Sequence, residues 1–219
     1  GVSSAASDVY KRQYKGKVVK KMKIDNIIIQ IIGNWIDQMQ KKNWLLEEDR
    51  EYYQYAMEVR LEEILTIATV FFVIICMRQF VNGLTFLVSF LTLRKRTGGF
   101  HMKTFEACYM ATVGTFVAVI FVAKYVHTYS KIGFICTCIA SVYVVVIGTV
   151  NNPDIDMNNS ELSVSKKCAR IVLTVELLIV IVGMRIKKCK EIVIMISLAI
   201  ILCSILMKFA QLKYQEKMS

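Results

Sequence analysis

The sequence predicts an all-α, polytopic membrane protein: about six apolar helices preceded by an N-terminal amphipathic helix at the membrane interface. Apolar residues make up 55% of the 219 residues, and they gather into long runs, which is typical of membrane-spanning helices. The chain contains a single proline. The runs lack the alternation of polar and apolar residues that a lipid-facing barrel needs, so long strands are not expected.

The N-terminal part divides into two segments. Residues 1–21 are polar and basic, lack the apolar middle of a signal peptide, and are interpreted as a non-native or disordered leader, with Met22 as the expected start. Residues 22–63 are predicted to form an amphipathic, interfacial helical region that ends in a charged, tyrosine-rich stretch. The helical spacing is carried by Ile24, Ile27, Ile28, Ile31, Ile32, Trp35, Ile36 and Met39.

Two placements of this amphipathic helix are open. The tryptophan suits the level of the lipid headgroups, so we expect the helix to lie flat on the membrane. Alternatively, its apolar face packs against the protein's own helix bundle.

Six apolar runs follow and are expected to form a transmembrane bundle over residues 64–207, with a cytoplasmic tail at 208–219. Several runs are shorter than the roughly 20 residues that cross a bilayer as a helix. Flanking lysines and arginines can snorkel and the bilayer can thin, so six spans remain feasible. The first two runs are divided only by Met77–Gln79 and form either two spans, a tight hairpin or a re-entrant pair. The runs are 64–77, 79–93, 105–123, 132–150, 171–184 and 192–207.

The net charge of +11 is unevenly distributed: from residue 64 onward there are 17 Lys/Arg against 7 Asp/Glu. In a membrane protein this excess indicates cytoplasmic loops that meet anionic headgroups of the lipid bilayer, with an acidic substrate as a further option, and not nucleic acid. Placing the loops 94–104 and 151–170 and both termini in the cytoplasm satisfies the positive-inside rule. The cations between residues 185 and 190 are the exception, because they would lie outside.

The seven cysteines form no Cys-x-x-Cys pair. Cys136 and Cys138 are two residues apart and therefore point to different faces of a helix. We predict no disulfide framework, no metal site and no cofactor.

The loop 94–108 is the candidate catalytic segment because it combines cations, two glycines, His101 and Cys108. A thiol attacks as the thiolate, which neighbouring positive charge and a helix N-terminus favour. In one unbroken helix the two side chains would stand about 10.5 Å apart along the axis. Proton transfer needs about 3 Å or one bridging water, so the helix must begin after His101. The Gly98–Gly99 pair permits the required turn.

The alternative interpretation needs no chemistry. His101 is then an ordinary residue of a basic cytoplasmic turn, and Cys108 fills space in a helix bundle.

At these residues the chain resembles the accessory gene regulator B family of bacterial membrane cysteine endopeptidases. That family has an arginine, a glycine two residues before a histidine, and a cysteine seven residues after it. The matching positions here are Arg94, Gly99, His101 and Cys108. The apolar layout from Ile24 to Met207 is also similar, and a weaker likeness involves Asn152, Pro153 and Glu161.

The resemblance implies a membrane endopeptidase that cleaves the C-terminal part of a short precursor peptide for quorum sensing. Cys108 would form the acyl-enzyme, and His101 would act as general base and then acid. An internal Cys or Ser of the substrate would close a thiolactone or lactone ring. Arg94 is expected to orient the site or bind an acidic stretch of substrate, while Gly98 and Gly99 supply the turn. The expected location is the bacterial cytoplasmic membrane, with the loop on the cytoplasmic side.

Two further functions remain as alternatives. A small transporter or peptide-export component would use Glu176 and Asn82 along its path, and a membrane scaffold would need neither. The chain lacks the Gly/Pro-broken helix pair usual in transporters, which favours the peptidase. No third catalytic residue is evident, and the oligomeric state is open, a homodimer included.

Overall fold

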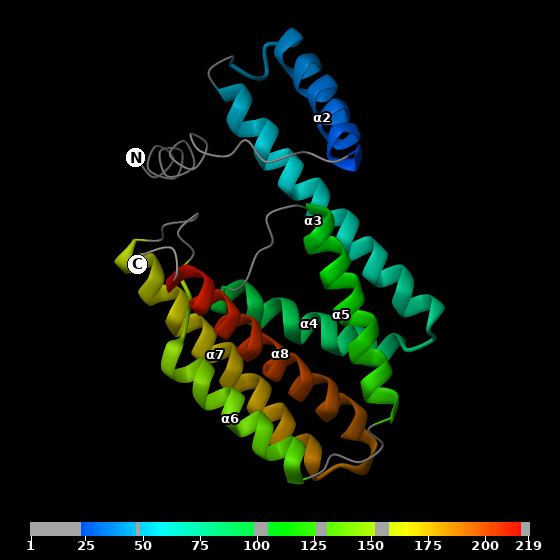
Figure 1. Ribbon diagram of the computed structural model, residues 1–219, viewed down its shortest axis with the longest axis vertical. Helices are drawn as coiled ribbons and strands as arrows, with labels where there is room; N and C mark the ends of the chain where they lie inside the picture. The colour runs from blue at the N-terminus through cyan, green and yellow to red at the C-terminus, as the bar shows by residue number, and fades with distance from the viewer. Residues whose placement is uncertain (1–22, 47–48, 99–104, 126–130, 152–157, 216–219) are drawn as a thin grey trace. The chain divides into compact units, whose positions relative to one another are not determined.

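The computed structural model describes residues 23–46, 49–98, 105–125, 131–151 and 158–215 (Figure 1). All regular elements in these ranges are helical, so the predicted all-α class is confirmed. The leader 1–21, the loop residues 99–104 and the last residues of the tail, 216–219, lie outside the described residues. The helices are α2 (Lys23–Lys41), α3 (Arg50–Cys76), α4 (Phe80–Thr97), α5 (Phe105–Tyr125), α6 (Lys131–Ile147), α7 (Asn159–Met184) and α8 (Lys190–Gln215), with a short 3-10 helix, η3 (Lys187–Cys189), before α8.

The helices extend beyond several of the apolar runs. Helix α3 begins at Arg50, so the first run is only its second half, and α8 continues past Met207 to Gln215. By length and composition, two segments are long and apolar enough to cross a membrane, Glu106–Ala123 and Lys190–Lys213, while Ile132–Ile147 is apolar but shorter. Six complete spans therefore stay a prediction.

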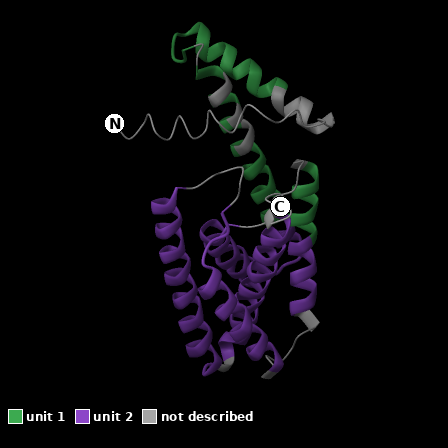
Figure 2. Ribbon diagram, turned by 60° about the vertical axis from the view of Figure 1, so that its left-hand side comes forward, with its two compact units in different colours: residues 1–72, 102–114 green, residues 73–101, 115–219 purple. Residues whose placement is uncertain are grey.

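The chain forms two compact units, shown in green and purple in Figure 2. The first comprises residues 1–72 and 102–114, and the second comprises residues 73–101 and 115–219.

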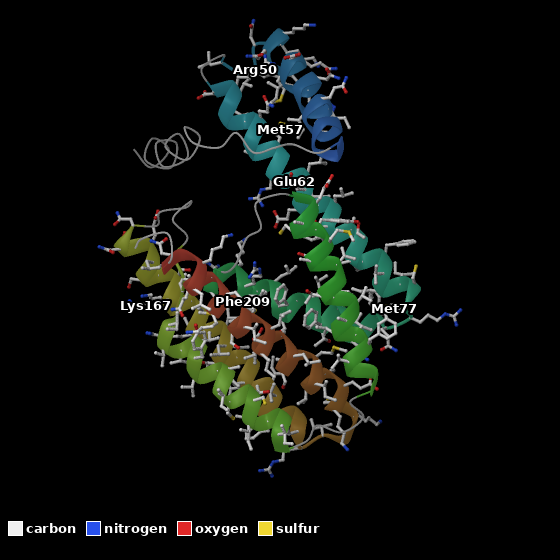
Figure 3. All side chains as sticks on the ribbon, in the orientation of Figure 1. Arg50, Met57, Glu62, Met77, Lys167 and Phe209 are labelled. Carbon is white, nitrogen blue, oxygen red and sulfur yellow. The ribbon has the colours of Figure 1, made fainter. Side chains whose placement is uncertain are left out.

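In the first unit, the apolar face of α2 packs against the first half of α3. Ile32 and Ile36 are almost fully buried there, and Met57 of α3, labelled in Figure 3, packs against them. Burying one such side chain contributes about 1.5–3 kcal/mol. Arg50 at the start of α3 binds Asp37 of α2 at 2.6 Å.

This packing is with the first half of α3, which precedes the predicted bundle, so it does not decide between the two placements considered for the amphipathic helix. Trp35 remains 52% exposed on the same helix. Its insertion at the headgroup level stays a prediction.

The second unit is a bundle of α4, α6, α7 and α8, in which pairs of contacting residues give the helix directions. Early residues of α4 and α8 meet through Asn82 and Glu191, whose side chains lie 2.7 Å apart, so these two helices run parallel. The late residues Tyr143 of α6 and Gln211 of α8 are also hydrogen-bonded, which aligns α6 with them. Helix α7 runs in the opposite direction, since its first turns lie beside the end of α4.

As a consequence, the ends of α4, α6 and α8 and the start of α7 share one end of the bundle. The two basic loops that follow α4 and α6 therefore leave at the same end, as the orientation prediction requires. The opposite end carries Arg185, Lys188 and Lys190, so positive charge lies at both ends and does not by itself decide the side.

The outer faces of α6 and α7 are covered with exposed apolar side chains. A soluble monomer rarely exposes a continuous apolar surface of this kind, whereas a lipid-facing helix must. The residues are Ile132, Phe134, Ile135, Ile139, Val142, Val145 and Val146 on α6 and Ile171, Val175, Leu178, Ile179, Ile181 and Val182 on α7.

Candidate active site

The predicted catalytic loop leaves from the C-terminal end of α4, whose last turn carries three consecutive cations. They are Arg94, Lys95 and Arg96, and positive charge at this end interacts favourably with the helix dipole. The side chain of Arg94 is half-buried, and its guanidinium lies 5.8 Å from the centre of the Phe90 ring. Arg94 is therefore held partly inside the bundle, beside the start of the loop.

Gly98 ends α4 in a conformation that essentially only glycine adopts. Its φ is 68° and its ψ is −164°, and its N–H donates to the carbonyl of Arg94 at 3.1 Å. A Cβ at this position would lie 2.7 Å from the carbonyl oxygen of Val150. Any side chain here would thus strain both the backbone and the contact. Gly99 and His101 lie outside the described residues.

Cys108 lies in the first turn of α5 and is half-buried. The structure describes α5 from Phe105 onward, and residues 99–104 lie outside the described ranges, so the condition set by proton transfer stays a prediction. The first N–H groups of a helix give this position a favourable potential for an anion. The adjacent Tyr109 donates to Thr69 of α3 at 2.9 Å, so the start of α5 is tied to α3 within the first unit.

Of the five predicted site residues, the structure describes three, and it places them in different compact units. Arg94 and Gly98 belong to the second unit, whereas Cys108 belongs to the first. The pairing of His101 with Cys108 stays a prediction.

Three residues missed by the sequence reasoning hold the end of α4 through its backbone. The carbonyl oxygen of Arg96 accepts hydrogen bonds from the hydroxyls of Thr149 and Ser165, each at 2.9 Å. The N–H of Val150 donates to the carbonyl of Thr97 at 2.9 Å. No local sequence pattern predicts these contacts, because the partners of α4 lie on α7 and in the segment after α6.

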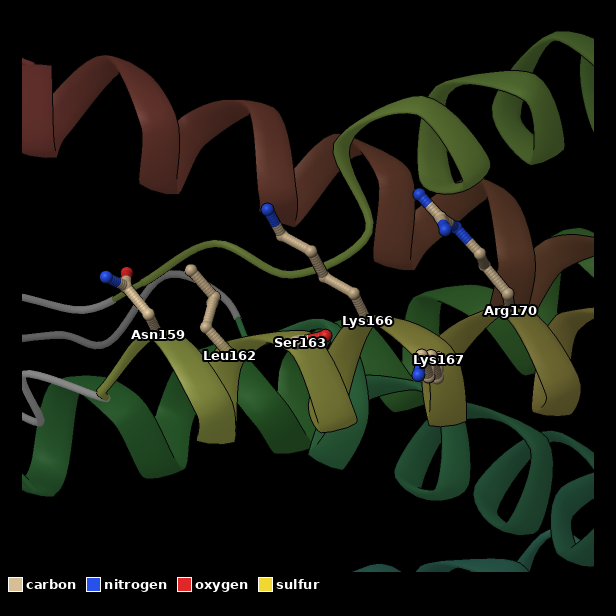
Figure 4. Close-up of a pocket in the computed structure, with 6 residues that line it drawn as sticks. All are labelled: Asn159, Leu162, Ser163, Lys166, Lys167 and Arg170. Carbon is tan, nitrogen blue, oxygen red and sulfur yellow. The ribbon is translucent and has the colours of Figure 1, made fainter.

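A surface pocket of about 320 Å³ lies beside the N-terminal turns of α7, at the same end of the bundle (Figure 4). Its basic lining residues are Lys166, Lys167 and Arg170, and the others are Asn159, Leu162 and Ser163. Three cations on one helix would accept carboxylate or phosphate groups.

Glu161, from the weaker sequence likeness, has a structural role here. Its carboxylate accepts the backbone N–H of Asn158 at 3.0 Å, which caps the start of α7. Asn152 and Pro153 lie outside the described residues.

Glu176 is buried in the middle of the bundle, with 6% of its surface exposed. Its Oε1 accepts a hydrogen bond from Ser89 of α4 at 2.7 Å, while its Oε2 has no hydrogen-bond partner among the described residues. An ionisable group at such a position is costly and usually structural or functional. Within the described ranges, no group of three or more His, Cys, Asp or Glu residues is placed to hold a metal ion.

The family model described as accessory gene regulator B matches residues 17–210. No curated protein and no solved structure matches the chain. Because the match covers most of the sequence, this membrane protein belongs to the accessory gene regulator B family, which is known for the processing of autoinducer peptides.

Proposed function

We propose that this protein is a membrane-embedded cysteine endopeptidase that matures a short autoinducer precursor peptide for quorum sensing. It cleaves off the C-terminal part of the precursor and promotes cyclisation of the remainder through an acyl-enzyme thioester. The observation that carries the proposal is the occurrence of Arg94, Gly99, His101 and Cys108 at the family's spacing, within a chain that the family model matches over residues 17–210.

In the first step, His101 removes the proton from the Cys108 thiol, and the thiolate attacks the carbonyl carbon of the scissile peptide bond. The C–N bond then breaks. His101, now protonated, transfers its proton to the leaving amine of the C-terminal fragment. The N-terminal part of the precursor remains bound to Cys108 as a thioester.

In the second step, a Cys or Ser side chain within the bound peptide attacks the thioester carbonyl. Its proton passes to His101, the bond to the sulfur of Cys108 breaks, and a thiolactone or lactone ring closes. The thioester conserves the reactivity needed for ring closure, and an internal nucleophile has a high effective concentration. A site at the membrane surface that excludes water would favour cyclisation over hydrolysis.

We place the catalytic loop on the cytoplasmic side. Cations lie at both ends of the bundle, so charge alone does not decide the side. The loop after α4 leaves at the end that also carries Lys166, Lys167 and Arg170. This basic end offers anion-binding groups for anionic lipid headgroups or an acidic stretch of the precursor.

The transport alternative rests on the buried carboxyl of Glu176. Ser89 already occupies one of its oxygens, and the amide of Asn82 is bonded to Glu191 and Gln79 at the end of the bundle. A transporter would lose activity in Glu176→Gln and would be indifferent to Cys108→Ser. The peptidase has the opposite pattern.

The test is co-expression of the protein with short open reading frames from its genomic neighbourhood, with mass spectrometry of the peptides. We expect a cleaved, cyclised product with the wild type and none with Cys108→Ser, because serine lacks a thiolate. Cys138→Ser is the matched control, since Cys138 is exposed on α6, and it should retain full cleavage. Both variants should reach the membrane in equal amounts. Undiminished cleavage by Cys108→Ser would refute the proposal.

A further inference from the structure

The C-terminal end of a helix leaves its last carbonyl groups without partners inside the helix, and they must bond elsewhere. At the end of α4 these groups are bound by residues distant in sequence. The Arg96 carbonyl oxygen accepts from the hydroxyls of both Thr149 and Ser165, at 2.9 Å each. The next carbonyl, that of Thr97, accepts the N–H of Val150 at 2.9 Å. We call Thr149, Val150 and Ser165 the α4 clamp.

The clamp is buried at Thr149 and Val150, whereas Ser165 is half-buried and its hydrogen bond is exposed. The side chain of Thr97 is fully buried and that of Thr149 is 5% exposed. Gly98 lies so close to the Val150 carbonyl that a Cβ would stand 2.7 Å from its oxygen. The backbone of residues 96–98 therefore has little room to shift without breaking these hydrogen bonds.

The clamp acts on the residues that lead directly into the predicted catalytic loop. The chain leaves α4 at Gly98, and the family motif continues with Gly99 and His101. A catalytic base must be held to within about 0.5 Å of its productive position by the groups around it. The contacts that fix where the loop starts come from the segment after α6 and from α7.

We infer that Thr149 and Ser165 are positioning residues for the proposed peptidase reaction: their hydroxyls fix the end of α4 and thereby the place from which the loop presents His101. This inference rests on the proposed function and adds two residues to it. Neither hydroxyl is assigned contact with substrate. Their effect passes through the backbone of Arg96.

The experiment removes the hydroxyls while preserving side-chain size as far as possible. The variants are Thr149→Val, Ser165→Ala and the double variant, assayed for precursor cleavage in membranes. Displacing a catalytic group by about 1 Å lowers the rate by about 100-fold, so we expect the double variant to lose about that factor in kcat. KM should stay within about twofold, because the substrate-binding groups are untouched. Thr149→Ser keeps the hydroxyl, so its kcat should equal that of the wild type.

The matched control is Thr137→Val on α6, the helix that precedes Thr149. Thr137 is also buried, at 1% exposed, but its hydroxyl donates to Gly133 within its own helix. It should leave kcat unchanged. A second measurement is the pH dependence of alkylation of Cys108, followed by mass spectrometry of its peptide. We expect this profile to move to higher pH in the double variant and not in Thr137→Val, because a displaced His101 no longer assists loss of the thiol proton.

The outcomes separate the two proposals. If Cys108→Ser abolishes cleavage while the double variant retains wild-type kcat and an unchanged alkylation profile, the clamp inference is wrong and the peptidase stands. If kcat falls equally in Thr137→Val, the loss reflects general destabilisation and the inference is also wrong. If Cys108→Ser cleaves normally, the peptidase proposal itself fails.

Discussion

Helix α4 has a residue with positive φ at each of its ends, Arg78 before it and Gly98 after it, at 55° and 68° respectively. Arg78 is exposed in the short turn between α3 and α4. Nearby, Asn82 bonds to Glu191 and Gln79 through side chains only. At the other end, by contrast, backbone carbonyls are bound by Thr149, Val150 and Ser165, and Gly98 has no room for a Cβ.

This difference shows which of the two ends of α4 is fixed by tertiary contacts. An arginine with positive φ is tolerated where the chain is surrounded by solvent, at a cost of about 1–2 kcal/mol. At Gly98 the close contact is with the backbone carbonyl of Val150, so no flexible side chain can shift to relieve it. The end of α4 that leads to the proposed site is therefore the more constrained one, as expected for a segment that positions a catalytic group.

The largest loss of precursor cleavage is expected for Gly98→Ala, because this substitution lies at the constrained end of α4. The substitution places a side chain in a backbone region restricted to glycine, costing about 1–3 kcal/mol, and drives a Cβ against the Val150 carbonyl. We expect precursor cleavage to fall by about 100-fold or more, since the start of the loop must move.

The control for Gly98→Ala is Gly33→Ala in α2, where a Cβ meets nothing within 4 Å. Alanine there should stabilise the protein by about 0.5–1 kcal/mol through helix propensity. Equal cleavage by the two variants would show that the conformation at Gly98 is not needed.

An intermediate effect is expected for Gly83→Ala near the start of α4. A Cβ at this position would lie 2.7 Å from Cγ1 of the Ile74 side chain. Overpacking of this kind costs about 1–3 kcal/mol, part of which a side-chain shift can relieve. Thermal unfolding in detergent should show the loss of stability, while cleavage per folded molecule should remain within about twofold of wild type. A loss of kcat as large as that of Gly98→Ala would mean that both ends of α4 control the site.

The smallest effect is expected for Arg78→Gly. Glycine relieves the positive φ but raises the entropy of the unfolded chain, so the two contributions nearly cancel. The free energy of unfolding should change by no more than about 0.5 kcal/mol, and cleavage should be unaltered. A marked loss of stability or of cleavage would mean that Arg78 makes a contact as specific as those at the other end of α4.

The helices themselves were predictable because their signals are local. Each apolar run overlaps one helix over most of its length, and the isoleucine periodicity of residues 24–39 corresponds to α2. The boundaries were less predictable, since apolarity marks burial in lipid or protein and not the extent of helical hydrogen bonding. Helix α3 therefore starts at Arg50, within the charged stretch, and α6 ends at Ile147, where Gly148 turns to a φ of 73°.

For the candidate site, sequence alone determined the combination of residues: Arg94, the two glycines, His101 and Cys108 lie within one short segment, and their chemistry and spacing can be read directly. Only the tertiary structure decided what holds that segment. Thr149 and Ser165 meet Arg96, and Glu176 meets Ser89, across more than fifty residues of chain. Propensity and periodicity act over one or two helical turns, whereas these contacts depend on how whole helices align, and a linear pattern does not encode that alignment in any single place.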